Sequence, residues 1–296
     1  MRYIILFPDK NNYAFHYFKS DNCETYNVYK KTKCNKILRC IRKLLYFFGF
    51  GINYCLYDDW KNFINDKNVQ FIVFDSCKPY HRLEKVLKKC ANKPIIYFWN
   101  PIDKEKSKIK RLKKLFDVYS YSEKDCKLYE LKFNGQFLPN LPKDNLKIVY
   151  DSCFLGKSKN RLNLILNVYN ALPNSWFYIV GDEINDKIKM HSERYSYLEY
   201  LKRIQESKCI VEVLPSSNAG FTLRTIEAIY YDKKLITNNL SIRNCSFYNK
   251  NMILIFDEKT SQDEIINFLS NENIPYSNKI KQQFSFEQWL KNFGKE

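Results

Sequence analysis

Short apolar runs alternate with amphipathic stretches along the first half of the chain. The apolar runs predict five strands, at Tyr3–Phe7, Asn53–Tyr57, Val69–Asp75, Pro94–Trp99 and Val118–Ser122. Amphipathic patterns at 34–48, 79–91, 103–115 and 123–131 predict helices between them. Because strands that alternate with helices form a parallel sheet covered on both faces, this half predicts an α/β domain.

The alternation continues through the second half, after a segment that is typical of a linker. Residues 134–145, NGQFLPNLPKDN, hold one glycine, two prolines and three asparagines between apolar patterns. The elements expected beyond it are a strand from Lys147 to Tyr150 or Phe154, a helix at 160–167, a strand at Trp176–Val180, a helix at Tyr197–Ser207, a strand at Met252–Asp257 and a helix at Gln262–Leu269. We therefore predict two α/β domains, at 1–140 and 141–280.

The most informative stretch is residues 209–239, which read as a βαβ unit. A buried strand at Cys209–Leu214 is followed by a polar loop to Gly220, a helix to about Tyr231 and a second strand at Lys234–Thr237. In such a unit the first turn of the helix lies at the ligand-binding edge of the sheet. Its free N–H groups and the positive end of its dipole attract phosphate there.

The residues of this helix divide into two faces when they are placed at 100° intervals. One arc can face the sheet and contains Thr222, Leu223, Ile226, Ile229 and Tyr230. A separate stripe contains Gly220, Arg224, Glu227 and Tyr231. A carboxylate two turns into the helix can accept both hydroxyls of a ribose, and an arginine one turn in can reach a phosphate oxygen. Alternatively, Arg224 and Glu227 form a surface ion pair worth a few tenths of a kcal/mol.

The run GFTLRTIEAIYYDKKLIT, residues 220–237, resembles the donor-binding segment of GT-B glycosyltransferases, especially bacterial enzymes of capsule and lipopolysaccharide assembly. Those enzymes have a G-x-T-x-R-x-x-E-A helix followed by a K-K-L-I-T strand. The run is more distantly similar to the E-x7-E segment of retaining GT-B enzymes, with Glu227 as the second glutamate and Ala219 in place of the first. That departure leaves open the donor sugar and whether transfer would be retaining or inverting.

The resemblance implies two Rossmann-like domains facing a cleft, with a nucleotide sugar bound mainly by the second. The donor-binding residues it implies are Gly220, Phe221, Thr222, Arg224 and Glu227. GT-B enzymes also have a G-x-x-x-x-R run after the first strand of that domain, which here gives Gly156, Lys157 and Arg161 as a second phosphate clamp. GT-B chains often end in a helix that crosses back to the first domain, and 281–296 is the candidate.

The net charge of +17 is concentrated in the first half of the chain. Residues 1–147 contain 30 Lys and Arg against 15 Asp and Glu, a net charge of +15, while residues 148–296 carry +2. Such a surface favours a lipid-pyrophosphate acceptor or an anionic membrane as partner, unless it serves solubility alone. Nucleic acid is an unlikely partner, because the sequence has no motif for binding it. No D-x-D motif stands in a likely loop, so we expect no metal or other cofactor.

The segment at 33–50 is the most amphipathic of the chain. It has an apolar arc, opposing cations and further aromatic residues at Tyr46, Phe47 and Phe50. The arc either packs on the sheet or contacts a membrane surface. No apolar run is long enough to span a membrane, and the first residues resemble a strand rather than a signal peptide. We expect a cytoplasmic protein, peripheral on the inner face of the membrane if that segment docks.

The sequence predicts a metal-independent glycosyltransferase that transfers a sugar from a nucleotide-sugar donor to a cell-surface glycan or lipid-linked acceptor. A base for the acceptor hydroxyl is expected on a loop of the first domain. Asp75, at the end of an apolar strand, is the first candidate and His16 the second, although either also fits a structural role. A different class of function is a non-catalytic nucleotide-binding or membrane-docking protein of the same fold, which the alanine at 219 favours.

Overall fold

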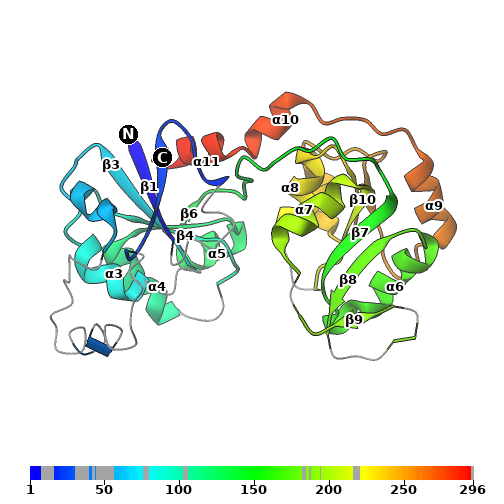
Figure 1. Cartoon of the computed structure of the whole chain (residues 1–296), viewed down its shortest axis with the longest axis horizontal. Helices are drawn as coiled ribbons and strands as arrows, with labels where there is room; N and C mark the ends of the chain where they lie inside the picture. The colour runs from blue at the N-terminus through cyan, green and yellow to red at the C-terminus, as the bar shows by residue number, and fades with distance from the viewer. Residues whose placement is uncertain are drawn as a thin grey trace. The chain divides into compact units, whose positions relative to one another are not determined.

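The computed structural model describes residues 1–7, 17–30, 40–41, 44, 57–75, 80–102, 106–181, 185–186, 188–193, 195–215 and 221–294. The chain divides into two compact units, which are described separately (Figure 1). Unit 1 consists of Met1–Gly135 and Phe286–Glu296, and unit 2 of Gln136–Ser285. Each unit holds a six-stranded sheet whose strand pairs are all parallel. The prediction of two Rossmann-like domains is therefore confirmed.

The sheet of unit 1 has the strand order β2-β1-β3-β4-β5-β6. Its strands are β1 (Arg2–Phe7), β2 (Cys23–Asn27), β3 (Val69–Phe74), β4 (Ile95–Phe98), β5 (Asp117–Ser120) and β6 (Lys132–Phe133). The chain runs from β1 outward to β2 and then returns to pair β3 on the other side of β1. The point where the strand order reverses therefore lies between β1 and β3, which is where open α/β sheets bind ligands.

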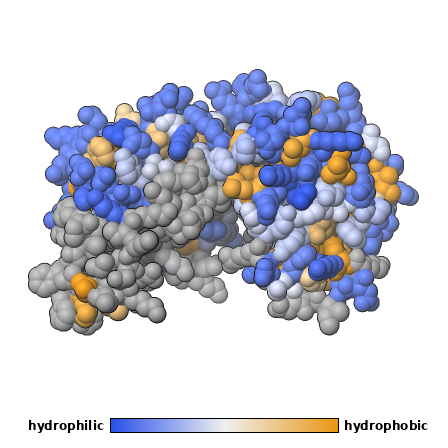
Figure 2. Space-filling view, in the orientation of Figure 1, coloured by the Kyte–Doolittle hydropathy of each residue, from blue (hydrophilic) through white to orange (hydrophobic). Residues whose placement is uncertain are grey.

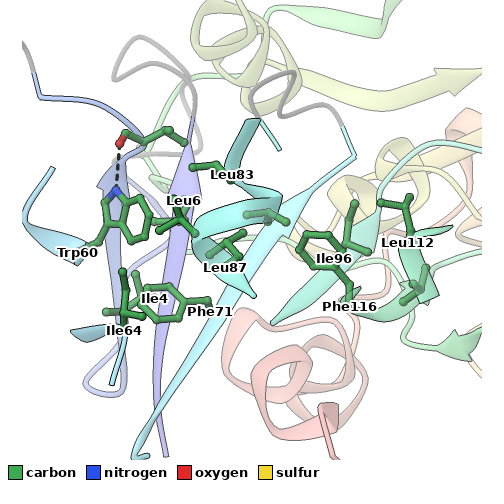
Figure 3. Packing of buried hydrophobic residues seen from close by; sticks show 14 of the residues in the cluster. Ile4, Leu6, Trp60, Ile64, Phe71, Leu83, Leu87, Ile96, Leu112 and Phe116 are labelled. Carbon is green, nitrogen blue, oxygen red and sulfur yellow. Dashed lines mark hydrogen bonds between the residues drawn. The ribbon is translucent and has the colours of Figure 1, made fainter. Parts of the chain in front are cut away.

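Apolar side chains cover both faces of this sheet. The helices of unit 1 are η2 (Asp59–Phe63), α3 (Tyr80–Leu87), α4 (Lys106–Leu115), α5 (Glu123–Tyr129) and α11 (Phe286–Asn292). Alternate residues of β1, β3 and β4 pack against α3 and α4 in one core, and Figure 3 shows Ile4, Leu6, Phe71, Leu83, Leu87, Ile96 and Leu112 there. Trp60 joins this core and donates from Nε1 to the carbonyl of Val28 at 3.0 Å.

The last helix of the chain, α11, packs on unit 1. Trp289 stacks on Phe74 at 5.9 Å between ring centroids, and Asn134 donates from Nδ2 to the Trp289 carbonyl at 3.1 Å. Phe286 and Trp289 are both buried. The final residues of the sequence thus complete the core formed by the first half.

The sheet of unit 2 has the strand order β12-β11-β10-β7-β8-β9. Its strands are β7 (Tyr150–Lys157), β8 (Trp176–Val180), β9 (Met190–His191), β10 (Ser207–Glu212), β11 (Lys234–Thr237) and β12 (Ile253–Ile255). Strands β7, β8 and β9 follow one another toward one side of the sheet, and β10, β11 and β12 toward the other. This is the doubly wound order of dinucleotide-binding folds. The strand order therefore reverses between β7 and β10.

Helices cover both faces of this second sheet as well. They are η3 (Lys159–Arg161), α6 (Leu162–Ala171), α7 (Tyr197–Gln205), α8 (Leu223–Tyr230), η4 (Leu240–Asn244), α9 (Gln262–Ser270) and α10 (Asn278–Gln283). Residues of α6 and α9 share one core with β7, β10 and β11. Helices α7 and α8 contact β10. The predicted βαβ unit is present as β10, α8 and β11, with Cys209 opposite Lys234 in the parallel pair.

The structure corrects two predictions of secondary structure. Strand β2 was not predicted at all. The strand expected at Asn53–Tyr57 stays a prediction, because it lies outside the described residues except for Tyr57, which forms an isolated bridge with Tyr29. Strand β7 extends through Gly156 to Lys157, where a loop was expected.

Most of the amphipathic segment at 33–50 lies outside the described residues. Of its apolar arc, Ile41 is 44% exposed and Leu44 is 55% exposed, so these two side chains do not pack on the sheet as expected. On the face seen in Figure 2, the described surface of unit 1 is mostly hydrophilic. No helix in the described part of the chain is long and apolar enough to cross a membrane.

Candidate functional site

The first turn of α8 lies at the carboxyl ends of the strands in unit 2 and is tied to β10 and β11 by a buried carboxylate. Thr222 caps α8 by accepting the Arg224 N–H at Oγ1, at 3.1 Å. Glu212, the last residue of β10, accepts hydrogen bonds from the hydroxyls of Thr222, Thr225 (3.1 Å) and Thr237 (2.6 Å). Both carboxylate oxygens of Glu212 are therefore bonded, and this network fixes where α8 starts.

Glu227 is fully buried in the interior of α8 and only half of its carboxylate is bonded. Oε1 accepts the Tyr197 hydroxyl at 2.6 Å. Oε2 has no hydrogen-bond partner among the described residues and lies 4.0 Å from Nη1 of Arg224. Burial raises the pKa of Glu227, while Arg224 and the Tyr197 hydroxyl lower it by a smaller amount. The i,i+3 ion pair of Arg224 and Glu227 is therefore present, but it is not a surface pair, because the side chain of Glu227 is 0% exposed.

Arg224 connects α8 to the neighbouring strand and remains charged. Its Nη2 donates to the carbonyl of Leu155 in β7 at 2.8 Å, and its guanidinium lies 4.9 Å from the ring centroid of Tyr200. Burial lowers the pKa of Arg224, but Tyr200, Glu227 and other nearby groups raise it more, so the net shift is upward. The side chain is still 25% exposed, so this cation is both held in place and open to a ligand.

Arg161 places a second guanidinium at the same edge of the sheet. It donates from Nη1 to the carbonyl of Val213, and from Nη2 to that of Lys157 at 3.0 Å. These carbonyls lie at the carboxyl ends of β10 and β7. Burial lowers the pKa of Arg161, and so does the positive charge of Arg224. Both guanidiniums are held against β7, by the Lys157 and Leu155 carbonyls, and their like charges would attract an anion.

Gly156 contributes close packing, because it lies inside β7 and not in a phosphate-binding loop. A Cβ at this position would lie 2.8 Å from the ring of Phe154 and 3.4 Å from Nη2 of Arg161. Gly156 thus leaves the space that the Phe154 ring needs, while Nη2 of Arg161 would be at ordinary contact distance. Lys157 ends the strand with an exposed side chain.

The remaining predicted donor residues have different surroundings. Phe221 packs edge-on against Phe247 and Phe284, at 5.4 and 6.1 Å between ring centroids. Gly220 lies outside the described residues. The structure therefore brings Arg161, Arg224 and Glu227 to the carboxyl ends of the neighbouring strands β7 and β10, which we call the β7–β10 edge.

In unit 1, Asp75 directly follows β3, beside the point where the strand order reverses. Its Oδ1 accepts the backbone N–H of Trp99 and its Oδ2 accepts Nδ2 of Asn100, both at 3.1 Å. Burial raises the pKa of Tyr121 to about 12, and Asp125 and Asp75 add to that shift. Asp75 thus has a structural role at the end of β4, and its role as a base stays a prediction. His16 lies outside the described residues.

Sequence reasoning missed two residues of the hydrogen-bond network around α8, Tyr197 and Glu212. A glutamate within the apolar run CIVEV was the available signal for Glu212, because a buried carboxylate needs donors. No local signal identified Tyr197, since it meets Glu227 only because α7 packs beside α8. Among the described residues, no three His, Cys, Asp or Glu side chains are grouped as a metal site would require.

No protein-family model matches the chain, and no curated protein matches its sequence. Among solved structures, a variant of TarM from S. aureus in complex with fondaparinux, α-GlcNAc-glycerol and UDP is similar, with a TM-score of 0.50 and 16% identity. The match covers 76% of this chain and 54% of TarM, so the chain spans about half the length of that protein.

Two further similarities are weaker. The lipopolysaccharide outer core galactosyltransferase WaaB has a TM-score of 0.44 and 14% identity over 99% of this chain and 98% of its own. The trehalose-6-phosphate phosphatase N-terminal domain of Candida albicans has a TM-score of 0.47 and 9% identity over 98% and 93%. These two TM-scores are below 0.5 and support no conclusion. The TarM similarity shows that the matched part of this chain has the same fold as the matched part of TarM.

Proposed function

We propose that this chain is a glycosyltransferase that binds a nucleotide-sugar donor at the β7–β10 edge of unit 2 and transfers its sugar to a glycan or lipid-linked acceptor. The observation that carries the proposal is the half-bonded, buried carboxylate of Glu227 beside the guanidinium of Arg224, with the Arg161 guanidinium held at the carboxyl ends of β7 and β10. A ribose diphosphate offers both kinds of missing partner. Its hydroxyls donate to a carboxylate, and its phosphates bind guanidinium.

The same groups would assist the departure of the nucleotide. Cleavage of the bond between the sugar and the diphosphate leaves negative charge on the terminal phosphate, and cations that are already in place stabilise that charge. Both arginines are fixed by backbone carbonyls of unit 2. We therefore propose that transfer needs no metal, so activity should survive a chelator.

On the acceptor side we propose Asp75 as the general base. Its carboxylate already accepts two hydrogen bonds, from Trp99 and Asn100, which orient it at the strand end. Deprotonation of the acceptor hydroxyl would then produce the nucleophile that attacks the anomeric carbon. Asp75→Asn keeps the side-chain size and should abolish transfer while leaving nucleotide affinity unchanged.

Unit 1 carries the basic charge of the chain, and we propose that it meets an anionic membrane bearing a lipid-linked acceptor of capsule or lipopolysaccharide synthesis. The exposed Ile41 and Leu44 would insert at the interface. Sedimentation with phosphatidylglycerol vesicles should exceed that with phosphatidylcholine and fall with salt. Ile41→Ser with Leu44→Ser should reduce it, while Leu240→Ser, at a 70% exposed position of unit 2, should not. Equal recovery on both vesicles would remove the membrane from the proposal.

The test of the main proposal is calorimetric titration with UDP, GDP, ADP and CMP, followed by the sugar derivatives of whichever nucleotide binds. One nucleotide should bind at least tenfold more tightly than the others, and its sugar derivative should be hydrolysed slowly without acceptor. Binding without turnover would favour a non-catalytic nucleotide-binding protein, which the alanine at 219 also favours. If none of the four binds at millimolar concentration, both functions are excluded.

A further inference from the structure

Unit 2 contains a cavity of about 250 Å³ on a side of α8 away from Arg224 and Glu227. Its floor is apolar and is formed by Leu138, Ile226, Ile229 and Phe284. A cavity of about 150 Å³ already accepts a benzene ring, so this one holds a ring with a substituent. Leu138, Ile226 and Ile229 are each at most 3% exposed, so a ligand would meet them only at the bottom of the cavity.

The cavity is separate from the donor site, although both use α8. It is lined by Ile226, Ile229 and Tyr230, which follow one another at the three- and four-residue spacing of one helix face. At 100° for each residue, Glu227 lies about 100° and Arg224 about 160° from Ile226 around the same helix. The two sites can therefore be filled independently, and the test of one does not depend on the other.

Positive charge marks the mouth of the cavity. Lys143 and Lys281 both line it, and Asp232 is the one carboxylate that either of them engages among the described residues. That carboxylate pairs with Lys281 at 2.5 Å. Lys143 forms no ion pair with any described carboxylate, and its Nζ lies 4.2 Å from the ring centroid of Tyr230. Two ammonium groups thus share a single carboxylate, and one positive charge is left unbalanced.

Burial lowers the pKa of Lys143, and the charge of Lys281 lowers it further. Lys143 is nevertheless an exposed residue, so an anion can reach its ammonium group.

We propose that this cavity binds a small anionic molecule with an apolar body, whose phosphate or carboxylate meets Lys143 and whose ring or branched chain rests on Ile226 and Ile229. The apolar floor selects against free phosphate, and the unbalanced ammonium selects against the neutral analogue. A single negative group suffices, because the charge excess at the mouth is one.

Phenyl phosphate is a suitable probe, and inorganic phosphate and phenol are its two halves. Calorimetric titration of the full chain should show phenyl phosphate binding at least tenfold more tightly than either half. Lys143→Met should weaken phenyl phosphate about tenfold or more, since it removes a charge-assisted bond while keeping the chain length. Lys143→Arg should restore binding.

Lys147→Met is the matched control, because Lys147 is an exposed lysine near Lys143 in sequence that does not line the cavity. It should leave the affinity unchanged, as should Arg161→Ala, which alters the donor site alone. An unchanged affinity in Lys143→Met, an equal affinity for inorganic phosphate, or no binding at millimolar concentration would each overturn the proposal. Loss of binding in Arg161→Ala would assign the phenyl phosphate to the donor site instead.

Discussion

Replacement of Glu227 by glutamine is the sharpest test of the donor site. The amide keeps the size of the side chain, and its carbonyl can still accept the Tyr197 hydroxyl that now bonds Oε1 at 2.6 Å. It loses the acceptor at Oε2, the oxygen that has no partner among the described residues. The substitution therefore removes the proposed ribose contact while it leaves the local packing in place.

The expected loss of affinity follows from that one contact. A hydrogen bond to a charged acceptor contributes about 1.5–3 kcal/mol. At about 1.4 kcal/mol for each factor of ten, the Kd for the preferred nucleotide should rise about 10- to 150-fold. The free energy of unfolding without ligand should not fall, because the variant also removes the cost of burying a charge that is bonded on one oxygen only.

Two measurements on the same variant separate a ligand contact from a structural one. Calorimetric titration gives the Kd, and chemical denaturation without ligand gives the free energy of unfolding. Glu199→Gln is the matched control, since it makes the same change of charge at an exposed position on α7. It should alter neither quantity.

An unchanged Kd together with a lower free energy of unfolding would refute the reasoning. It would mean that Glu227 only balances the charge of Arg224 inside the protein and does not bind a ligand. A loss of affinity with full stability is the result that a structural role cannot produce.

Three further outcomes are expected. The nucleotide affinity of the wild type should fall as pH drops through the raised pKa of Glu227, because the carboxylate becomes protonated. Over the same range, as pH falls from the raised pKa toward the ordinary glutamate pKa of 4.5, the free energy of unfolding should rise. Subtracting the pH profile of Glu227→Gln removes the titration of the nucleotide itself. Gly156→Ala should cost about 1–3 kcal/mol of stability and weaken nucleotide binding, whereas Gly135→Ala, whose Cβ would find its nearest neighbour at 3.9 Å, should be neutral. Thr237→Val should cost about 1–3 kcal/mol in chemical denaturation, because it leaves an oxygen of Glu212 unbonded.

The sequence predicts elements well where local pattern decides them. Strand β11 matches its predicted range, and α8 ends one residue before the expected Tyr231, because apolar runs and helical spacing are local properties. Strand β2 was missed because its residues, CETYN, lack a clear apolar alternation, and its pairing partner β1 is distant along the chain. Gly156 was assigned to a loop because glycine usually interrupts strands. In the folded protein the ring of Phe154 fills the space of its missing side chain.

The candidate site was predicted in composition but not in environment. Spacing placed Arg224 and Glu227 on one stripe of α8, and the structure does place them 4.0 Å apart. Spacing could not show that α7 covers this stripe, since Tyr197 approaches Glu227 only through tertiary packing. Burial converts a marginal surface pair into a carboxylate whose unsatisfied oxygen carries an energetic cost. That cost is what a ligand can relieve.

The two buried glutamates beside α8 differ in the way that separates a structural group from a binding group. Glu212 accepts three hydroxyl donors and both of its oxygens are bonded, so changes around it should lower stability before they lower affinity. Glu227 accepts one and keeps an unbonded oxygen, so changes there should lower affinity first. A buried acceptor without a donor costs about 1–3 kcal/mol, and a protein retains such a group where a ligand supplies the donor. Thr237→Val should therefore lower the free energy of unfolding more than the nucleotide affinity, and Glu227→Gln should lower the affinity and leave the free energy of unfolding unchanged. A loss of both quantities in both variants would show that both carboxylates are structural.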